Sequence, residues 1–488
     1  QALDIDRVTT LTANSVIDSG SGAITIAGTI NGNYTLALNG SAGVTSIDAV
    51  IGGGTAINTL TTEAGGSTSI NANITSNGTQ TYNDTVDIEG GTRTLTSNGG
   101  AIFFDGTVDS LGATNRGLTV NAGSGLTTFD AVVGNTNDLG AIIISGSGGL
   151  DLDAAIGIRA GNSGATSLAV TGASNLGADV NTSSTQVYTG AVTLDSGGTN
   201  TLEAGGAGVN FASTLTTNAT ENLVITGALD LDGAATGLGT LAVSGASNLG
   251  ANVTSGGTQT YSGATTLSGG NRTITTSDDA ITFGSTITGA NNDLTIAAGT
   301  GITEFDGAVT MGTGAIAITG GMNLDANIVS ASSLSVSTTS DIGGDVTTTG
   351  SQTYTGAATL STAARTLTSS SSGAVLFSST INGTQNLTVA TGGLTTFDGL
   401  VGNLTILGAI DISGAGGLDL DAAIALANGT AGAASLDVNG ATNLGANVVT
   451  TGAQIYTGAV TVSVDTTLTN TNSNVTFTGA LDADATER

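Results

Sequence analysis

The sequence predicts an all-β protein folded as a parallel β-helix, a β-solenoid of roughly 20 to 24 coils with no helical domain. Three observations predict it. Val, Ile and Leu alternate with Thr, Ser and Asn in short segments, which is typical of strands. These segments recur in a long internal repeat. Proline, which would interrupt a ladder of backbone hydrogen bonds, is absent from all 488 residues.

The composition excludes the other simple explanations of a glycine-rich chain. Disordered chains are poor in apolar residues and rich in charge, whereas 39% of this chain is hydrophobic and 9% is charged. Collagen needs glycine at every third position together with proline. Of the 37 acids 31 are Asp, which favours turns, and only six are Glu, which favours helices. Without cysteine, stability must come from burial and backbone pairing.

A marker with the pattern Q-x-Y, followed by an apolar strand, occurs five times. It lies at 80–82, 186–188, 259–261, 352–354 and 454–456. The spacings between successive markers are 106, 73, 93 and 102 residues. Sandwich domains would keep a more constant period, whereas a solenoid tolerates the gain or loss of single coils. We therefore predict that residues 1–488 form one continuous β-solenoid.

Further segments recur in order between the markers. They are R-T-[LI]-T at Arg93, Arg272 and Arg365, a Phe strand at Phe104, Phe283 and Phe377, T-x-F-D at Phe129, Phe305 and Phe397, L-D-L-D at Leu150, Leu229 and Leu418, and N-L-G-A at Asn175, Asn248 and Asn443. Apolar centres are about ten residues apart, the spacing of a strand plus a turn. Because side chains alternate along a strand, the leucines of L-D-L-D should point inward and the aspartates outward.

The residue inventory excludes most catalytic chemistry, and we expect no enzyme. The chain has no His, Cys or Lys, so it can form no Ser-His-Asp triad, thiolate nucleophile, imidazole zinc site or phosphate-loop lysine. Seven arginines stand against 37 acids, giving a net charge of −30. Such a chain cannot neutralise phosphates, so we expect no nucleic-acid partner. No apolar run reaches the length of a membrane helix, and we expect no membrane insertion.

The aspartates of L-D-L-D are the candidates for a metal site. Two carboxylates at positions i and i+2 share one face of a strand, which could suit acid–base catalysis or a weakly bound calcium ion. The aromatic platforms of a sugar-cleaving site and the G-G-x-G-x-D calcium repeat are both missing. We favour a solvated outer face and no cofactor, with weak calcium as the alternative. The candidates are Asp151, Asp153, Asp230, Asp232, Asp419 and Asp421.

Two other motifs have simple structural explanations. In Q-x-Y we expect the Gln to pair with the backbone or stack at a corner, and the Tyr to pack with its hydroxyl satisfied. Thr-x-Thr steps such as Thr94/Thr96 raise the alternative of an ice-binding surface. That surface needs Thr on every coil, whereas these steps occur once per long repeat.

Segments such as TTGSQTYTGAATLSTAARTLTS and GGLTTFDGLVG resemble the repeats of bacterial filamentous-haemagglutinin-type large exoproteins. The resemblance covers nearly the whole chain. It implies a right-handed parallel β-helix exported as a surface adhesin or fibre. The secretion domain of that family carries N-P-N motifs, which a chain without proline lacks, so the resemblance concerns the shaft alone.

The two ends of the chain predict how copies assemble. The tail VTFTGALDADATER resembles FFDGTVDSLGATNR, which ends at Arg116, and QALDIDR then continues the pattern. We expect copies to stack head to tail, because such a contact does not close and generates a filament. The predicted contact residues are Gln1, Ala2, Leu3, Asp4, Ile5, Asp6, Ala485, Thr486, Glu487 and Arg488.

These observations predict a structural role outside the cell. We expect the chain to be a fibre subunit or the shaft of a secreted bacterial adhesin, with copies of itself and other cells or surfaces as partners. A carbohydrate-active β-helix enzyme and a cation- or ice-binding surface protein are the alternatives.

Overall fold

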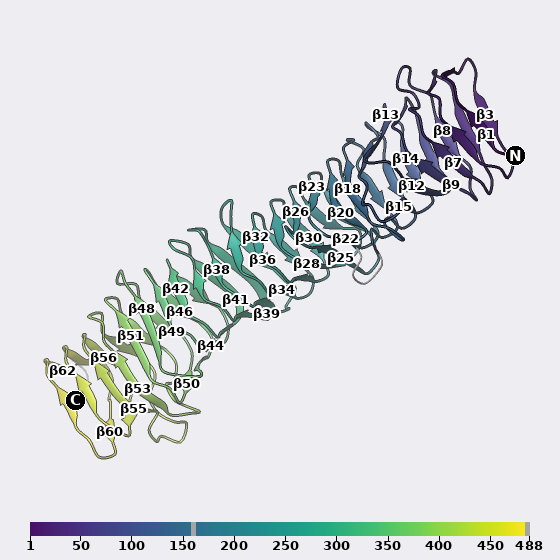
Figure 1. The fold of residues 1–488 in the computed structure, drawn as a ribbon. Helices are drawn as coiled ribbons and strands as arrows, with labels where there is room; N and C mark the ends of the chain where they lie inside the picture. The colour runs from purple at the N-terminus through teal and green to yellow at the C-terminus, as the bar shows by residue number, and fades with distance from the viewer. Residues whose placement is uncertain (158–162, 484–488) are drawn as a thin grey trace. The chain divides into compact units, whose positions relative to one another are not determined.

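The computed structural model describes residues 1–157 and 163–483. Within these residues all regular elements are β-strands, and their pairings are parallel apart from one isolated antiparallel bridge in a loop. The strands stack as a β-solenoid of about 22 turns, which we call coils (Figure 1). For the described residues the predicted all-β parallel β-helix, its coil number and the absence of a helical domain are confirmed. Its right-handedness stays a prediction.

The chain divides into two compact units, Gln1–Ser247 and Asn248–Arg488. Each unit by itself is a stack of coils built in the same way. The prediction that all 488 residues form one continuous solenoid concerns the relation between the two units and stays a prediction.

One coil contains three short strands joined by tight corners. In the first unit, β10 (Ile74–Ser76), β11 (Gln80–Tyr82) and β12 (Thr85–Ile88) form one coil. The next coil consists of β13 (Arg93–Ser97), β14 (Ile102–Phe104) and β15 (Val108–Ser110). Each strand pairs in register with the corresponding strand of the next coil. Three parallel sheets therefore run along the unit.

The core follows from the alternation of side chains along these strands. In β14 the side chains of Ile102 and Phe104 are buried and that of Phe103 is half-buried. The L-D-L-D strand β19 (Leu150–Leu152) has the same pattern, with both leucines inside. The prediction that leucines point inward and aspartates outward is confirmed. An interior only one strand wide suits Val, Ile and Leu, which supply most of the core.

The Q-x-Y marker supplies the largest core side chain. Tyr82, Tyr188, Tyr261, Tyr354 and Tyr456 are all fully buried. Their hydroxyls donate to Oε1 of the Gln two residues earlier, at 2.8 to 3.3 Å. Each of those Gln residues donates from Nε2 to a backbone carbonyl of the next coil, at 2.8 to 2.9 Å. The expectation that the Gln pairs with the backbone and the Tyr hydroxyl is satisfied is confirmed.

A phenylalanine of the next coil stacks on the tyrosine of each Q-x-Y marker. The ring centroid of Tyr82 lies 5.2 Å from that of Phe104, which lies 4.9 Å from that of Phe129. The Q-x-Y, Phe and T-x-F-D strands are β11, β14 and β17 (Thr127–Phe129), which pair in this order. The three motifs are therefore one feature, because they place aromatic rings above one another in consecutive coils.

Arginines of the R-T-[LI]-T segments hold corner loops together. Nε of Arg93 donates to the carbonyl oxygen of Glu89 at 2.7 Å, closing a loop in which Gly90 and Gly91 have φ of 69° and 145°. Arg272 makes the same contact with the carbonyl oxygen of Ser268, at 3.0 Å from Nε. Glycine adopts these φ values without strain. The glycines therefore allow the loop to turn, and the arginine closes it by its hydrogen bond.

The long repeat is not a whole number of coils. In the second unit the markers lie in β34 (Gln259–Tyr261), β46 (Gln352–Tyr354) and β58 (Gln454–Tyr456), which belong to three different sheets. Successive repeats thus present the same motif on a different face.

The short spacing of 73 residues after Gln186 reflects one missing coil. There, β23 (Gln186–Tyr188) pairs with β26 (Val209–Phe211), which pairs directly with the L-D-L-D strand β29 (Leu229–Leu231). In the first repeat the T-x-F-D strand β17 lies between the Phe strand and the L-D-L-D strand. The shortest spacing therefore arises from the loss of a single coil, which a solenoid tolerates.

Candidate functional site

The six predicted aspartates lie on the outer surface in two kinds of position. Asp151, Asp230 and Asp419 are central residues of their strands and half-buried. Asp153, Asp232 and Asp421 follow the strands at the corner and are exposed. The two aspartates of one motif therefore do not form a cleft of their own, and each central aspartate accepts a hydrogen bond from an amide on an adjacent coil.

At the corners carboxylates stack above one another. Phe104, Phe129 and Leu152 are in register, and the next residues are Asp105, Asp130 and Asp153. Partial removal from water raises the pKa of the Asp130 carboxyl, and the charge of Asp105 raises it further.

The same causes act on other aspartates in these stacks of corner carboxylates, which we call carboxylate ladders. The pKa of Asp153 is raised by partial desolvation and then by the charges of Asp151 and Asp130. In the second unit the pKa of Asp421 is raised by desolvation and by Asp419 and Asp398. The outer corners are therefore lines of carboxylates that repel one another.

Along the strand centres, by contrast, amides separate the carboxylates. Nδ2 of Asn175 donates to Oδ1 of Asp151 at 3.0 Å and to Oδ2 of Asp195 at 3.4 Å. Nδ2 of Asn443 donates to Oδ1 of Asp419 at 2.8 Å. The Asn of the N-L-G-A segment thus follows the L-D-L-D strand by one coil and partly compensates its charge. Sequence reasoning found both segments but missed their contact, because it did not assign the register between coils.

One group of three carboxylates could hold a hard divalent cation. It consists of Glu304, Asp306 and Asp325, whose oxygen atoms lie within 4.8 Å of one another. Glu304 and Asp306 belong to a T-x-F-D segment, and Asp325 lies one coil later. The six aspartates predicted from sequence are not part of this group. The signal that could have found it is the succession of a T-E-F-D coil and an N-L-D coil at 303–306 and 323–325.

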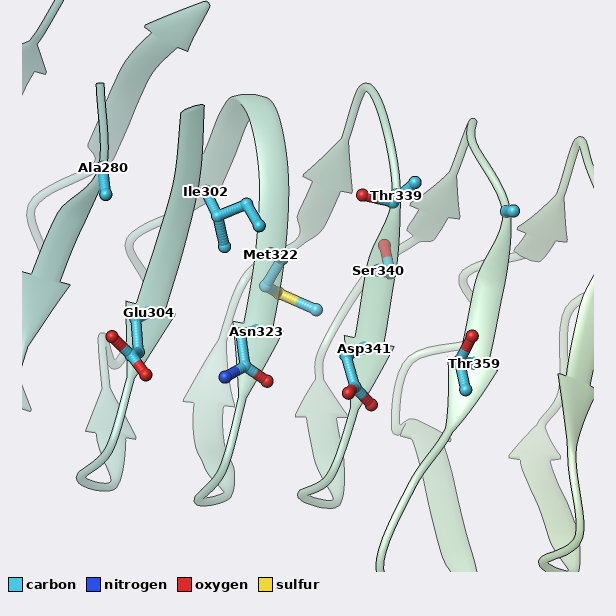
Figure 2. A pocket seen from close by; sticks show the side chains of 10 residues that line it. Ala280, Ile302, Glu304, Met322, Asn323, Thr339, Ser340, Asp341 and Thr359 are labelled. Atoms are coloured by element: carbon cyan, nitrogen blue, oxygen red, sulfur yellow. The ribbon is translucent and has the colours of Figure 1, made fainter. Parts of the chain in front are cut away.

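Three shallow grooves lie on the outer surface at corresponding places of three long repeats. Groove A is lined by Leu126, Gly148, Leu150, Ala173, Ser174, Asn175, Thr193, Asp195 and Asn218. Groove B is lined by Ala280, Ile302, Glu304, Met322, Asn323, Thr339, Ser340, Asp341, Ala357 and Thr359 (Figure 2). Groove C is lined by Leu394, Gly416, Leu418, Asp419, Ala441, Thr442, Asn443, Ala459 and Thr461. Their volumes are about 310, 490 and 310 Å³.

Figure 2 shows the side chains that line groove B. The side chains of Glu304, Asn323, Asp341 and Thr359 form one row, and Ile302 and Thr339 lie on the other side. The pairings Glu304 to Asn323 and Asn323 to Asp341 set this row. The sequence analysis did not predict these grooves, because each one combines residues from several coils.

Of the predicted assembly residues, the structure describes those near the N-terminus. Leu3, Asp4 and Ile5 form β1 (Leu3–Ile5), which pairs with β4 (Ile24–Ile26) along one edge. Within the described residues no strand pairs with the other edge of β1. Gln1, Ala2 and Asp6 flank this strand and are exposed. Ala485, Thr486, Glu487 and Arg488 lie outside the described residues.

In the described part of the chain there is no helix of the length and apolar character needed to cross a membrane. No family model, no curated protein and no solved structure matches this chain.

Proposed function

We propose that this chain is a structural element, the shaft of a secreted fibre or adhesin that spans distance outside a bacterial cell. The observation that carries the proposal is the coil itself. Backbone groups of each strand pair with the preceding and following coils, so the architecture extends by adding coils and needs no other layer. Because the length of such a scaffold is set by the number of its coils, it is suited to hold two structures apart at a defined distance.

The distribution of charge supports the same role. Arg93, Arg272 and Arg365 bond to loop carbonyls of their own chain, and Arg365 also lies 3.8 Å from Asp345. Acidic side chains line the outer corners. A surface of this kind repels nucleic acid and favours solubility, which fits an extended extracellular protein.

We further propose that copies stack end to end through the edge of β1 with which no described strand pairs, called its free edge. Unpaired strand edges are templates for pairing with another chain. The amide of Leu3 donates to the carbonyl oxygen of Ala23. Because successive amides of a strand point to opposite edges, the amide of Asp4 faces the free edge. Stacking through this edge would continue the parallel sheets into a second copy and generate an open filament.

One substitution tests this proposal without disturbing the internal pairing of β1. Asp4→Pro removes only the amide that faces the free edge, and Asp4→Asn is the matched control that keeps it. Light scattering and negative-stain images at rising concentration should show thin filaments for the wild type and Asp4→Asn, and separate particles for Asp4→Pro. A wild-type chain that stays monomeric at high concentration would contradict end-to-end assembly.

A further inference from the structure

Grooves A, B and C share one design although they lie in different long repeats. Each has a large aliphatic side chain on one wall, namely Leu126, Ile302 or Leu394. These side chains are the residue before T-x-F-D, and they are 36%, 51% and 42% exposed. An exposed aliphatic residue at the same place in three repeats has no role in the core, which makes it a candidate contact for a ligand.

The floor of the grooves is made by backbone. A Cβ atom at Gly148 would lie 1.8 Å from the carbonyl oxygen of Gly125, and one at Gly416 would lie 1.7 Å from that of Gly393. Only glycine fits at these two positions, so backbone of adjacent coils forms this part of grooves A and C. In groove B a Cβ at Gly321 would lie 3.3 Å from Cγ1 of Ile302 and would narrow the groove.

The opposite wall combines an amide, a carboxylate and a hydroxyl. In groove A, Asn175 bonds to Asp195, and Thr193 lies beside them. In groove C, Asn443 bonds to Asp419 beside Thr461.

Groove B follows the same scheme with one carboxylate more. Asn323 lies between Glu304 and Asp341 in register, and Oδ1 of Asp341 is buried without a hydrogen-bond partner among the described residues. Carboxylate oxygens accept several hydrogen bonds, and Asn443 in groove C keeps a second N–H beside the one that it donates to Asp419. In groove A both N–H groups of Asn175 already donate, to Asp151 and to Asp195, so the free hydrogen-bonding capacity of that wall lies on its oxygen atoms.

We propose that grooves A, B and C each bind a neutral sugar unit of a polysaccharide. A vicinal diol can donate to a carboxylate and accept from an amide N–H, which matches Asn443 and Asp419 in groove C. In groove A the diol would donate to oxygen atoms of the wall, because both N–H groups of Asn175 are already used. The C–H face of the sugar ring would pack against Leu126, Ile302 or Leu394. The volumes lie at the lower end of the range for small-molecule sites, about 300 to 1,000 Å³.

The chemistry of the walls selects against other ligand classes. No basic side chain lines the grooves, so anions would meet uncompensated carboxylates. Grooves A and C each have one carboxylate, which already accepts a hydrogen bond from an amide N–H. The other lining side chains are neutral, so the grooves would bind a cation only weakly. Because single grooves are shallow, each should bind a sugar unit weakly, and retention of the chain on an immobilised polymer should be the combined effect of separate weak contacts. This inference does not rest on the proposed structural role and goes beyond it.

The test uses the full chain and immobilised neutral polysaccharides, namely dextran, mannan and galactan, which together cover the common diol geometries. Polygalacturonate, polylysine and calcium are the anionic, cationic and metal comparisons. We expect at least one neutral polymer to retain the wild type in the presence of a chelator. The triple variant Leu126→Ala, Ile302→Ala, Leu394→Ala should be retained about tenfold less, and each single variant should lose only part of that.

The matched control is Leu404→Ala, because Leu404 is 73% exposed and lies outside the grooves. It should leave retention unchanged. A second triple variant, Asn175→Ala, Asn323→Ala, Asn443→Ala, should weaken retention as well, with circular dichroism showing that all variants keep their β-structure. Retention by none of the three neutral polymers, retention by polylysine alone, or equal retention of the wall variants and the wild type would overturn the proposal.

Discussion

The hydroxyl of Tyr82 donates a hydrogen bond of 2.9 Å to Oε1 of Gln80, two residues earlier on the same strand. Nε2 of that Gln in turn donates to the carbonyl oxygen of Thr96 and to Oγ of Ser76. Both side chains are fully buried. A polar cluster inside an apolar solenoid is stable only when all its members find partners, and here the two residues satisfy each other and tie one coil to the next.

The first prediction concerns this cluster in the fourth repeat. Tyr354→Phe removes the donor to Gln352 and should cost about 1 kcal/mol, whereas Gln352→Leu leaves the buried hydroxyl unpaired and should cost about 1 to 3 kcal/mol. The double variant should cost less than the sum, because the two residues form one network. Since repeat arrays do not unfold in a single step, hydrogen exchange of amides in β46 and β49 (Val375–Phe377) is the measurement. Additive costs would contradict the coupling.

The second prediction concerns the removal of one coil. Phe377 and Phe397 are in register, so deletion of 378–397 joins Phe377 to Asp398 and removes one coil. The repeat after Gln186 already lacks the corresponding coil, and the L-D-L-D strand follows the Phe strand there. The shortened chain should keep its β-sheet circular dichroism and a melting temperature close to that of the wild type.

The control for this deletion removes 378–387 alone, which is about half a coil. The following strands would then meet the wrong sheets, and their buried residues would face solvent. We expect this variant to aggregate or to lose a large part of its β signal. If the two deletions behave alike, the coil is not the unit of insertion and deletion.

Much of the fold could be predicted because its rule is local. Alternation over three residues placed Leu150 and Leu152 inside and Asp151 outside without any knowledge of the neighbouring coils. The contact between Asn175 and Asp151 could not be predicted in this way, because it depends on the number of residues in three successive corners. The grooves were missed for the same reason, since Leu126 and Asn175 lie two coils apart along one sheet.

The third prediction concerns pH. The pKa values of Asp130, Asp153 and Asp421 are raised in the folded state, with desolvation first and neighbouring carboxylates second. The stability that protonation contributes is complete below the unfolded pKa of about 3.9 and is lost as pH rises through the raised folded values. Acidification from pH 7 to about pH 4 should therefore raise the melting temperature.

Removing the charge of Asp130 tests whether the stacked carboxylates cause this pH dependence. Asp130→Asn should raise the melting temperature at pH 7 and reduce its dependence on pH, because one carboxylate between Asp105 and Asp153 is gone. Asp465→Asn removes an exposed charge outside this ladder and serves as the control. Equal effects of the two substitutions would show that net charge, and not the stacking of carboxylates, sets the pH dependence.

The fourth prediction concerns calcium at Glu304, Asp306 and Asp325. Their oxygens lie close enough to share one hard cation, and binding to the folded state alone raises stability by mass action. Millimolar calcium should therefore raise the melting temperature of the wild type, and Asp325→Asn should abolish this gain while Asp232→Asn keeps it. A chelator should leave the β-sheet circular dichroism intact, since the core and the backbone ladders do not depend on the ion. If the chelator abolishes the β signal, the cation is an integral part of the fold. If calcium changes nothing in the wild type, these carboxylates merely face water and the weak calcium site is wrong.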